Sequence, residues 1–78
     1  MNLTLVSLKA IFVTDGDWEG KRRRTIRAMM DADKIINEKH LSVAVDYFKS
    51  QVPYINDIDA VEYFHIDGKM YDTNFWSS

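Results

Sequence analysis

The chain has 78 residues, of which 46% are hydrophobic and 28% charged, with a formal net charge of −2 and no cysteine. This composition is typical of one small folded domain, spanning residues 1–78, and excludes a disordered chain. The lack of cysteine excludes disulfides, thiolate zinc sites and a cysteine nucleophile, and is consistent with a cytoplasmic protein.

The first stretch, residues 3–13, is predicted to be a β-strand because its apolar residues alternate and many are β-branched or aromatic. One face carries only apolar side chains: Val6, Leu8, Ala10 and Phe12. The other face mixes Leu5, Ile11 and Val13 with Ser7 and Lys9. The polar residues break the apolar run, no basic residue precedes it, and it is too short to cross a bilayer, so we expect neither a signal peptide nor a membrane anchor.

Residues 14–24 read TDGDWEGKRRR. The first half nearly matches a calcium-binding EF-hand loop through Asp15, Asp17, Glu19 and Gly20. However, Ile26 stands where that loop needs a bidentate glutamate, and four cations follow at once. We therefore expect no metal site, and interpret the stretch as a hairpin tip whose acids and cations partly neutralise each other.

Residues 21–32 resume the alternation and are predicted to form the second strand of the hairpin. One face is apolar: Ile26, Ala28, Met30 and Ala32. The other is largely cationic: Arg23, Thr25, Arg27 and Met29. A helix is the rival interpretation, because arginine, alanine and methionine are good helix formers.

One apolar stripe at spacings of three and four predicts an amphipathic helix. Its members are Leu41, Ala44, Val45, Phe48 and Val52. Asn37 is the expected N-cap, and Pro53 ends the helix. Ile35 and Ile36 lie off the stripe, so a kinked turn that begins at Asp33 is the alternative start.

The remaining chain predicts a loop at 54–59, a strand at 60–66 and a two-residue turn at Asp67-Gly68. Residues 69–76 form either a return strand, with Tyr71 opposite Phe64, or a loose tail. The fold class is therefore α+β: a small antiparallel sheet, β-β-α-β-β or β-β-α-β, with one helix packed across one face.

Signals for catalysis are weak. His40 and His65 are the only imidazoles, no serine has a nucleophile setting, and three scattered glycines do not make a phosphate loop. A pocket of even ~300 Å³ is also hard to house in so small a domain. We expect a non-catalytic protein without a cofactor.

Charge and aromatic residues favour protein binding by the C-terminal third. Residues 1–52 carry nine Lys/Arg and seven Asp/Glu, whereas residues 53–78 carry one lysine and five carboxylates. Tyrosine and tryptophan dominate binding hot spots, and carboxylates around them suit a basic partner. The predicted partner-binding residues are Asp57, Asp59, Glu62, Tyr63, Asp67, Tyr71, Asp72 and Trp76. A phage or mobile-element inhibitor that occupies a basic surface of a host protein has this layout.

The alternative is a small nucleic-acid-binding module. It would use a tryptophan beside a basic strand: Trp18, Lys21, Arg22, Arg23, Arg24 and Arg27. The neighbouring acids, the overall negative charge and the alternation of the strand all count against it. A third reading is an oligomerisation domain, since a homodimer would supplement the stability of so small a core.

Overall fold

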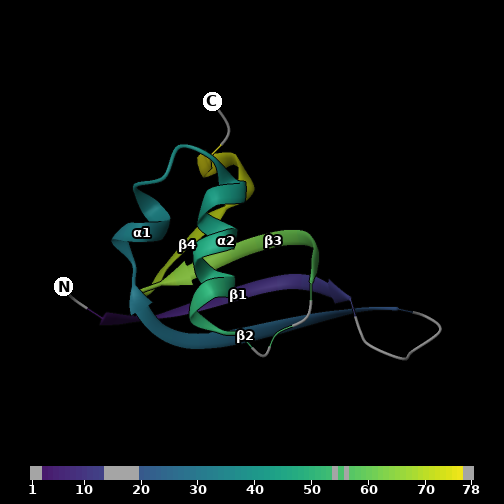
Figure 1. The fold of residues 1–78 in the computed structure, drawn as a ribbon. Coiled ribbons are helices and arrows are strands. Elements are labelled where there is room, and N and C mark those ends of the chain that lie inside the picture. The colour runs from purple at the N-terminus through teal and green to yellow at the C-terminus, as the bar shows by residue number, and fades with distance from the viewer. Residues whose placement is uncertain (1–2, 14–19, 54, 56, 77–78) are drawn as a thin grey trace.

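The structure is a computed structural model that describes residues 3–13, 20–53, 55 and 57–76. In chain order the elements are β1 (Leu3–Val13), β2 (Lys21–Asp31), α1 (Asp33–Ile36), α2 (Leu41–Gln51), β3 (Ile58–Ile66), β4 (Lys69–Asp72) and the 3-10 helix η1 (Thr73–Trp76). The strands form one antiparallel sheet in the order β2-β1-β3-β4, and α2 crosses one face of it (Figure 1). The α+β architecture predicted from the sequence is confirmed.

β1 is a central strand, and its alternation fills the core. Val6, Leu8, Ala10 and Phe12 are each at most 1% exposed. β1 pairs with β2 along its whole length, from Leu3 opposite Asp31 to Val13 opposite Lys21. The strand interpretation of residues 21–32 is therefore confirmed up to Asp31, and the helical rival is wrong, because pairing with β1 overrides the helix propensity of this stretch.

The apolar stripe on α2 packs on the sheet as predicted. Ala44, Phe48 and Val52 are buried, and Leu41 and Val45 pack partly buried against the same core. Phe48 meets Phe64 of β3 edge to face, with ring centroids 5.9 Å apart. This contact fixes the helix over the centre of the sheet.

The predicted N-cap of the long helix is wrong, whereas the alternative, a turn that begins at Asp33, is confirmed by α1. Asn37 instead ends the separate single turn α1, and His40 precedes the first residue of α2 in an extended conformation. The break has a tertiary cause: Ile35 lies off the α2 stripe, yet it is fully buried. A separate turn lets Ile35 enter the core from another direction than α2.

The C-terminal hairpin turns at Asp67-Gly68, where both residues have positive φ, +51° and +82°. A two-residue turn of this kind matches the twist of the paired strands. Phe64 lies opposite Tyr71, as predicted. Of the two alternatives for residues 69–76, the chain takes a short strand, and η1 then folds Trp76 into the core instead of leaving a loose tail.

Candidate functional site

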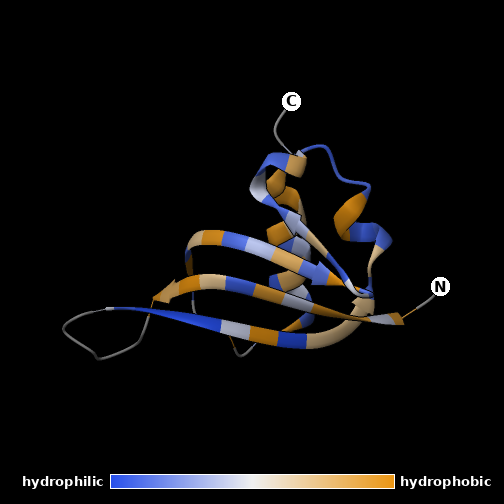
Figure 2. Ribbon diagram, turned by 180° about the vertical axis from the view of Figure 1, so that it is seen from behind, coloured by the Kyte–Doolittle hydropathy of each residue, from blue (hydrophilic) through white to orange (hydrophobic). Residues whose placement is uncertain are grey.

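The sheet has one covered and one uncovered face. Both helices and η1 lie on the side of the buried residues, and the view from behind shows no helix in front of the strands (Figure 2). We call the uncovered side the open face. It consists of the odd-numbered residues of β1 and β2, together with the side chains beside them in β3 and β4.

One end of the open face is apolar. Leu5 and Met29 lie directly opposite each other in β1 and β2 and are 51% and 56% exposed. Leu3 continues this patch along β1, and Met70 lies on the same face in β4. These are four of the six large hydrophobic side chains that are exposed in the described part of the chain. Such clustering is typical of an interaction surface.

The middle of the open face is polar and aromatic. Two rows of side chains cross all four strands here: Arg27, Ser7, His65 and Met70, then Thr25, Lys9, Tyr63 and Asp72. The Lys9 ammonium lies 5.8 Å from the centre of the Tyr63 ring, a cation–π arrangement. Arg27 is exposed and makes no ion pair with any residue that the structure describes.

The far end of the open face is held by two ion pairs that bridge over β1. Lys21 lies 3.4 Å from Asp59, and Arg23 lies 3.1 Å from Glu62. The register of β3 against β1 shifts twice, which adds Glu62 and Asp59 as extra residues of β3. β-bulges re-aim side chains, and here they bring two carboxylates within reach of cations two strands away.

These ion pairs are partly solvated contacts. The side chains of Lys21 and Asp59 are 58% and 41% exposed, and those of Arg23 and Glu62 are 62% and 32% exposed. Oε2 of Glu62 is inaccessible to water but makes no aligned hydrogen bond, so its contact with Arg23 is electrostatic. Exposed pairs of this kind contribute about 0–1 kcal/mol each.

The charges of the open face nearly balance. Its four cations are Lys9, Lys21, Arg23 and Arg27, and three carboxylates lie on the same face: Asp59, Glu62 and Asp72. A fourth carboxylate, Asp31, ends β2 and accepts the Asp33 backbone N–H. A surface that tracks a phosphate backbone is strongly positive instead.

The predicted partner-binding residues do not form one surface. Asp59, Glu62, Tyr63 and Asp72 lie on the open face. Tyr71 is on the opposite side of β4, where it is half-buried under the Lys69 ammonium, 5.2 Å from the ring centre. Alternation along β3 and β4 separates the two groups.

The other predicted contacts lie outside the open face. Trp76 is only 4% exposed and packs on Phe64 with ring centroids 5.4 Å apart, so its assignment as a partner-binding anchor is wrong. Asp57 forms an ion pair with Lys49 of α2 at 3.3 Å. Asp67 is exposed in the hairpin turn. The acidic residues are thus dispersed, and several serve contacts within the chain.

The predicted nucleic-acid-binding cluster is also divided. Lys21, Arg23 and Arg27 are on the open face, whereas Arg22 and Arg24 project from the helix side of β2. Trp18 lies outside the described residues, as do Asp15, Asp17 and Glu19 of the calcium-loop comparison. Among the residues that the structure describes, no three potential metal-ligating side chains form a group.

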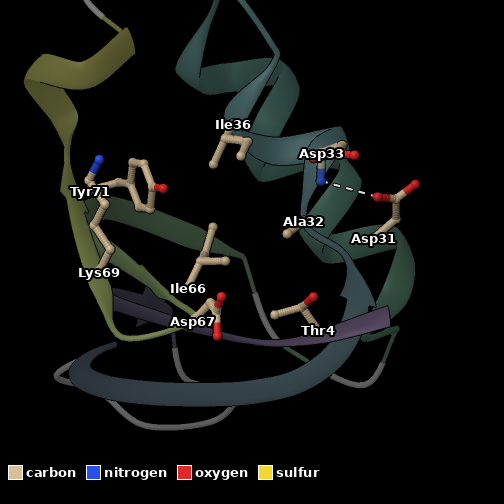
Figure 3. A pocket seen from close by; sticks show the side chains of 9 residues that line it. All are labelled: Thr4, Asp31, Ala32, Asp33, Ile36, Ile66, Asp67, Lys69 and Tyr71. Atoms are coloured by element: carbon tan, nitrogen blue, oxygen red, sulfur yellow. Dashed lines mark hydrogen bonds between the residues drawn. The ribbon is translucent and has the colours of Figure 1, made fainter. Parts of the chain in front are cut away.

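Two open hollows lie on the helix side of the sheet. One, of about 350 Å³, separates α1 from the start of β1 and the β3–β4 turn. Its lining combines apolar Ile36 and Ile66 with charged Asp31, Asp33, Asp67 and Lys69 (Figure 3). The other, of about 360 Å³, lies between α2 and β3. Both exceed the ~300 Å³ that we expected to be hard to house in so small a domain, because these hollows form between layers at the surface.

The first hollow brings together no recognisable catalytic set. Its nine lining residues include no histidine, and one of its carboxylates, Asp31, accepts a hydrogen bond from the Asp33 backbone N–H at 3.1 Å (Figure 3). Activation of a nucleophile would need a base within hydrogen-bond reach.

The exposed hydrophobic side chains of the open face were not predicted as contact residues: Leu3, Leu5 and Met29 at the apolar end, and Met70 in the neighbouring row. A signal was present, since alternation already assigned Leu5 and Met29 to the faces that carry lysine and arginine.

Comparison of the chain with family models, curated proteins and solved structures finds no match. The surface itself is therefore the basis for assigning a function.

Proposed function

We propose that this protein is a non-catalytic binding protein that contacts another protein through the open face of its sheet. The observation that carries the proposal is the concentration there of four of the six large exposed hydrophobic side chains in the described part of the chain. Patches of this kind mark interaction sites in soluble domains.

The residue types of the open face support a protein partner. Methionine, tyrosine and arginine are enriched in interface cores, and Met29, Met70, Tyr63 and Arg27 supply them. Methionine side chains adapt to irregular surfaces, and Arg27 offers several donors to a carboxylate or carbonyl group of the partner. The two bridging ion pairs then form a polar rim at the far end of the face.

The contact surface is then the sheet face instead of the acidic hairpin, and the mode of action is the same. A binding protein of this kind acts by occupying a surface that another molecule needs, as a phage or mobile-element inhibitor of a host protein does. Tyr63 and Asp72 remain contact residues in this arrangement, because they lie in the middle of the open face, in the row that also contains Lys9.

We also propose a cytoplasmic location, on the basis of a chain without cysteine. No helix in the described ranges has both the length and the apolar character needed to cross a membrane.

Capture from a nuclease-treated lysate tests the proposal with matched variants. Leu5→Lys places a charge on the open face, and Val43→Lys makes the same kind of change on α2, where the valine is 43% exposed against 51% for Leu5. We expect one protein to be retained by the wild type and by Val43→Lys and lost by Leu5→Lys. Equal retention by both variants would exclude the open face.

Nucleic-acid binding is less well supported, because the cations divide between two faces and those on the open face are balanced by carboxylates. The same capture distinguishes it. Loss of all recovery on nuclease treatment, together with sensitivity to Arg22→Ala and Arg24→Ala, would favour the nucleic-acid module. Loss on Asp67→Lys and Asp72→Lys, with Leu5→Lys unaffected, would return the contact to the acidic hairpin.

A further inference from the structure

The two edges of the sheet differ greatly in length. β4 ends one side with 4 residues, whereas β2 ends the other with 11 residues. No strand in the described part of the chain pairs with the outer side of β2 (Figure 1). A long edge strand presents a row of backbone donors and acceptors to which another strand can add.

We propose that β2 pairs with β2 of a second copy of this chain, antiparallel and about a twofold axis at Ile26. Ile26 is the midpoint of the strand, so this register sets Lys21 opposite Asp31 at both ends. The Asp31 backbone N–H already donates to the Tyr47 hydroxyl of α2 at 3.1 Å, so the new backbone ladder stops short of Asp31. The two four-stranded sheets then become one continuous sheet. An isologous contact of this type closes on itself and stops at the dimer.

The order of charges along β2 selects this register. In it, Lys21 lies opposite the second copy's Asp31, Arg23 opposite the second copy's Met29, and Arg24 opposite the second copy's Ala28. No cation lies directly opposite another cation. Like charges that face each other across two strands are destabilising, whereas opposite charges are favourable.

The neighbouring registers lack this property. A twofold axis at Thr25 places Arg23 opposite the second copy's Arg27, twice per dimer. An axis at Arg27 places the two Arg27 side chains opposite each other. A parallel, in-register pair would set every cation of β2 against its own copy. The cations that normally protect an edge strand therefore still permit pairing along most of β2 in one antiparallel register.

The dimer and the proposed function are compatible. A twofold axis perpendicular to the sheet keeps both open faces on one side and both helices on the other. The apolar ends formed by Leu5 and Met29 then lie on a single extended surface. The pairing joins two copies of this chain along the backbone edge of β2, so it stands or falls separately from the capture experiment.

Sedimentation and amide hydrogen exchange on the purified full chain test the pairing. We expect a reversible species of twice the 9.1 kDa chain mass as concentration rises. In an unpaired edge strand every second amide points outward and exchanges fast. We expect those amides of β2 to become protected as the dimer forms, except that of Asp31, which already donates to the Tyr47 hydroxyl. A monomer at all concentrations, or outward amides that stay fast in the dimer, would overturn the proposal.

Three variants separate the β2 edge from other contacts. Met29→Arg faces the second copy's Arg23 and should raise the dissociation constant of the dimer about 2- to 30-fold, while Met29→Glu should lower it. Met70→Arg makes the same change on β4 and should leave the dissociation constant of the dimer unchanged. It is a matched control, because Met70 is 57% exposed and Met29 is 56% exposed. Equal weakening by Met29→Arg and Met70→Arg would assign the dimer to the open face and overturn β2 pairing. These measurements contain no other protein, so their outcome is independent of partner capture.

Discussion

The indole Nε1–H of Trp76 donates a hydrogen bond to the backbone carbonyl of Ile35 at 3.0 Å. The bond joins η1, the last described element, to α1, 41 positions earlier in the chain. The carbonyls at the end of a helix have no partner within it, and the indole satisfies one of them in the core. Trp76 thereby packs η1 against Phe64 of β3 and links it to α1.

Removal of this bond should destabilise the fold measurably. In Trp76→Phe the Ile35 carbonyl keeps only the Glu38 backbone N–H at 3.4 Å, so we expect a loss of about 1–3 kcal/mol in the free energy of unfolding. Trp76→Ala also leaves a cavity and should cost about 3–5 kcal/mol. Urea unfolding followed by circular dichroism measures both. Phe75→Ala is the control, since Phe75 is 48% exposed and should cost less. Wild-type stability in Trp76→Phe would contradict the docking.

Leu5 and Leu8 provide a direct test of the two faces of β1. Both are leucines in the same strand, but Leu8 is fully buried and Leu5 is 51% exposed. We expect Leu8→Ala to lower the free energy of unfolding by about 2–5 kcal/mol, and Leu5→Ala to change it by about 0.5 kcal/mol. Chemical unfolding at a dilute, fixed concentration makes the comparison. Equal losses would mean that Leu5 is covered in the free protein.

The parts of the fold that depend on local pattern were predictable from the sequence. Strand alternation in residues 3–13 places the core residues correctly because a period of two is a property of the strand itself. The stripe from Leu41 to Val52 follows from the period of the helix, and the Asp67-Gly68 turn follows from the residue types that accept positive φ. Each of these signals lies within a dozen residues of the chain.

The parts that depend on distant contacts were not predictable in this way. The sequence left the start of α2 open between Asn37 and a turn from Asp33, and burial of Ile35, whose carbonyl bonds a residue 41 positions away, selects the separate turn. Likewise, the bulges that pair Glu62 with Arg23 arise from the match between β3 and β1. The acidic hairpin therefore looked like one binding surface in the sequence, while its residues divide between two sides of the sheet in the structure.

The hairpin turn should respond to backbone strain alone. Gly68 has φ of +82°, and an added Cβ would meet no atom within 4 Å, so Gly68→Ala introduces no clash. The left-handed conformation should still cost an L-residue about 1–2 kcal/mol. Thermal or urea unfolding gives the value. Asp67→Gly is the matched change at φ of +51° and should not destabilise the turn through its conformation. A cost above about 3 kcal/mol for Gly68→Ala would indicate a contact that the structure does not contain.

The start of α2 offers a stabilising substitution. His40 has the extended conformation of an N-cap, with φ of −121° and ψ of 135°, and its carbonyl accepts the N–H groups of Val43 and Ala44. Its side chain makes no capping hydrogen bond. Aspartate at this position should accept a backbone N–H of the first turn and favour the helix dipole, so we expect His40→Asp to raise the free energy of unfolding by about 1 kcal/mol.

The control for this substitution is Asn37→Ala, because the sequence pattern assigned the N-cap to Asn37. If α2 begins after His40, loss of the Asn37 side chain removes no N-cap from α2 and should have a smaller effect than the typical ~1 kcal/mol. Urea unfolding of the two variants decides between the two starts. A large loss in Asn37→Ala with no gain in His40→Asp would mean that the helix begins at Asn37, and that Ile35 is held by something other than the separate turn α1.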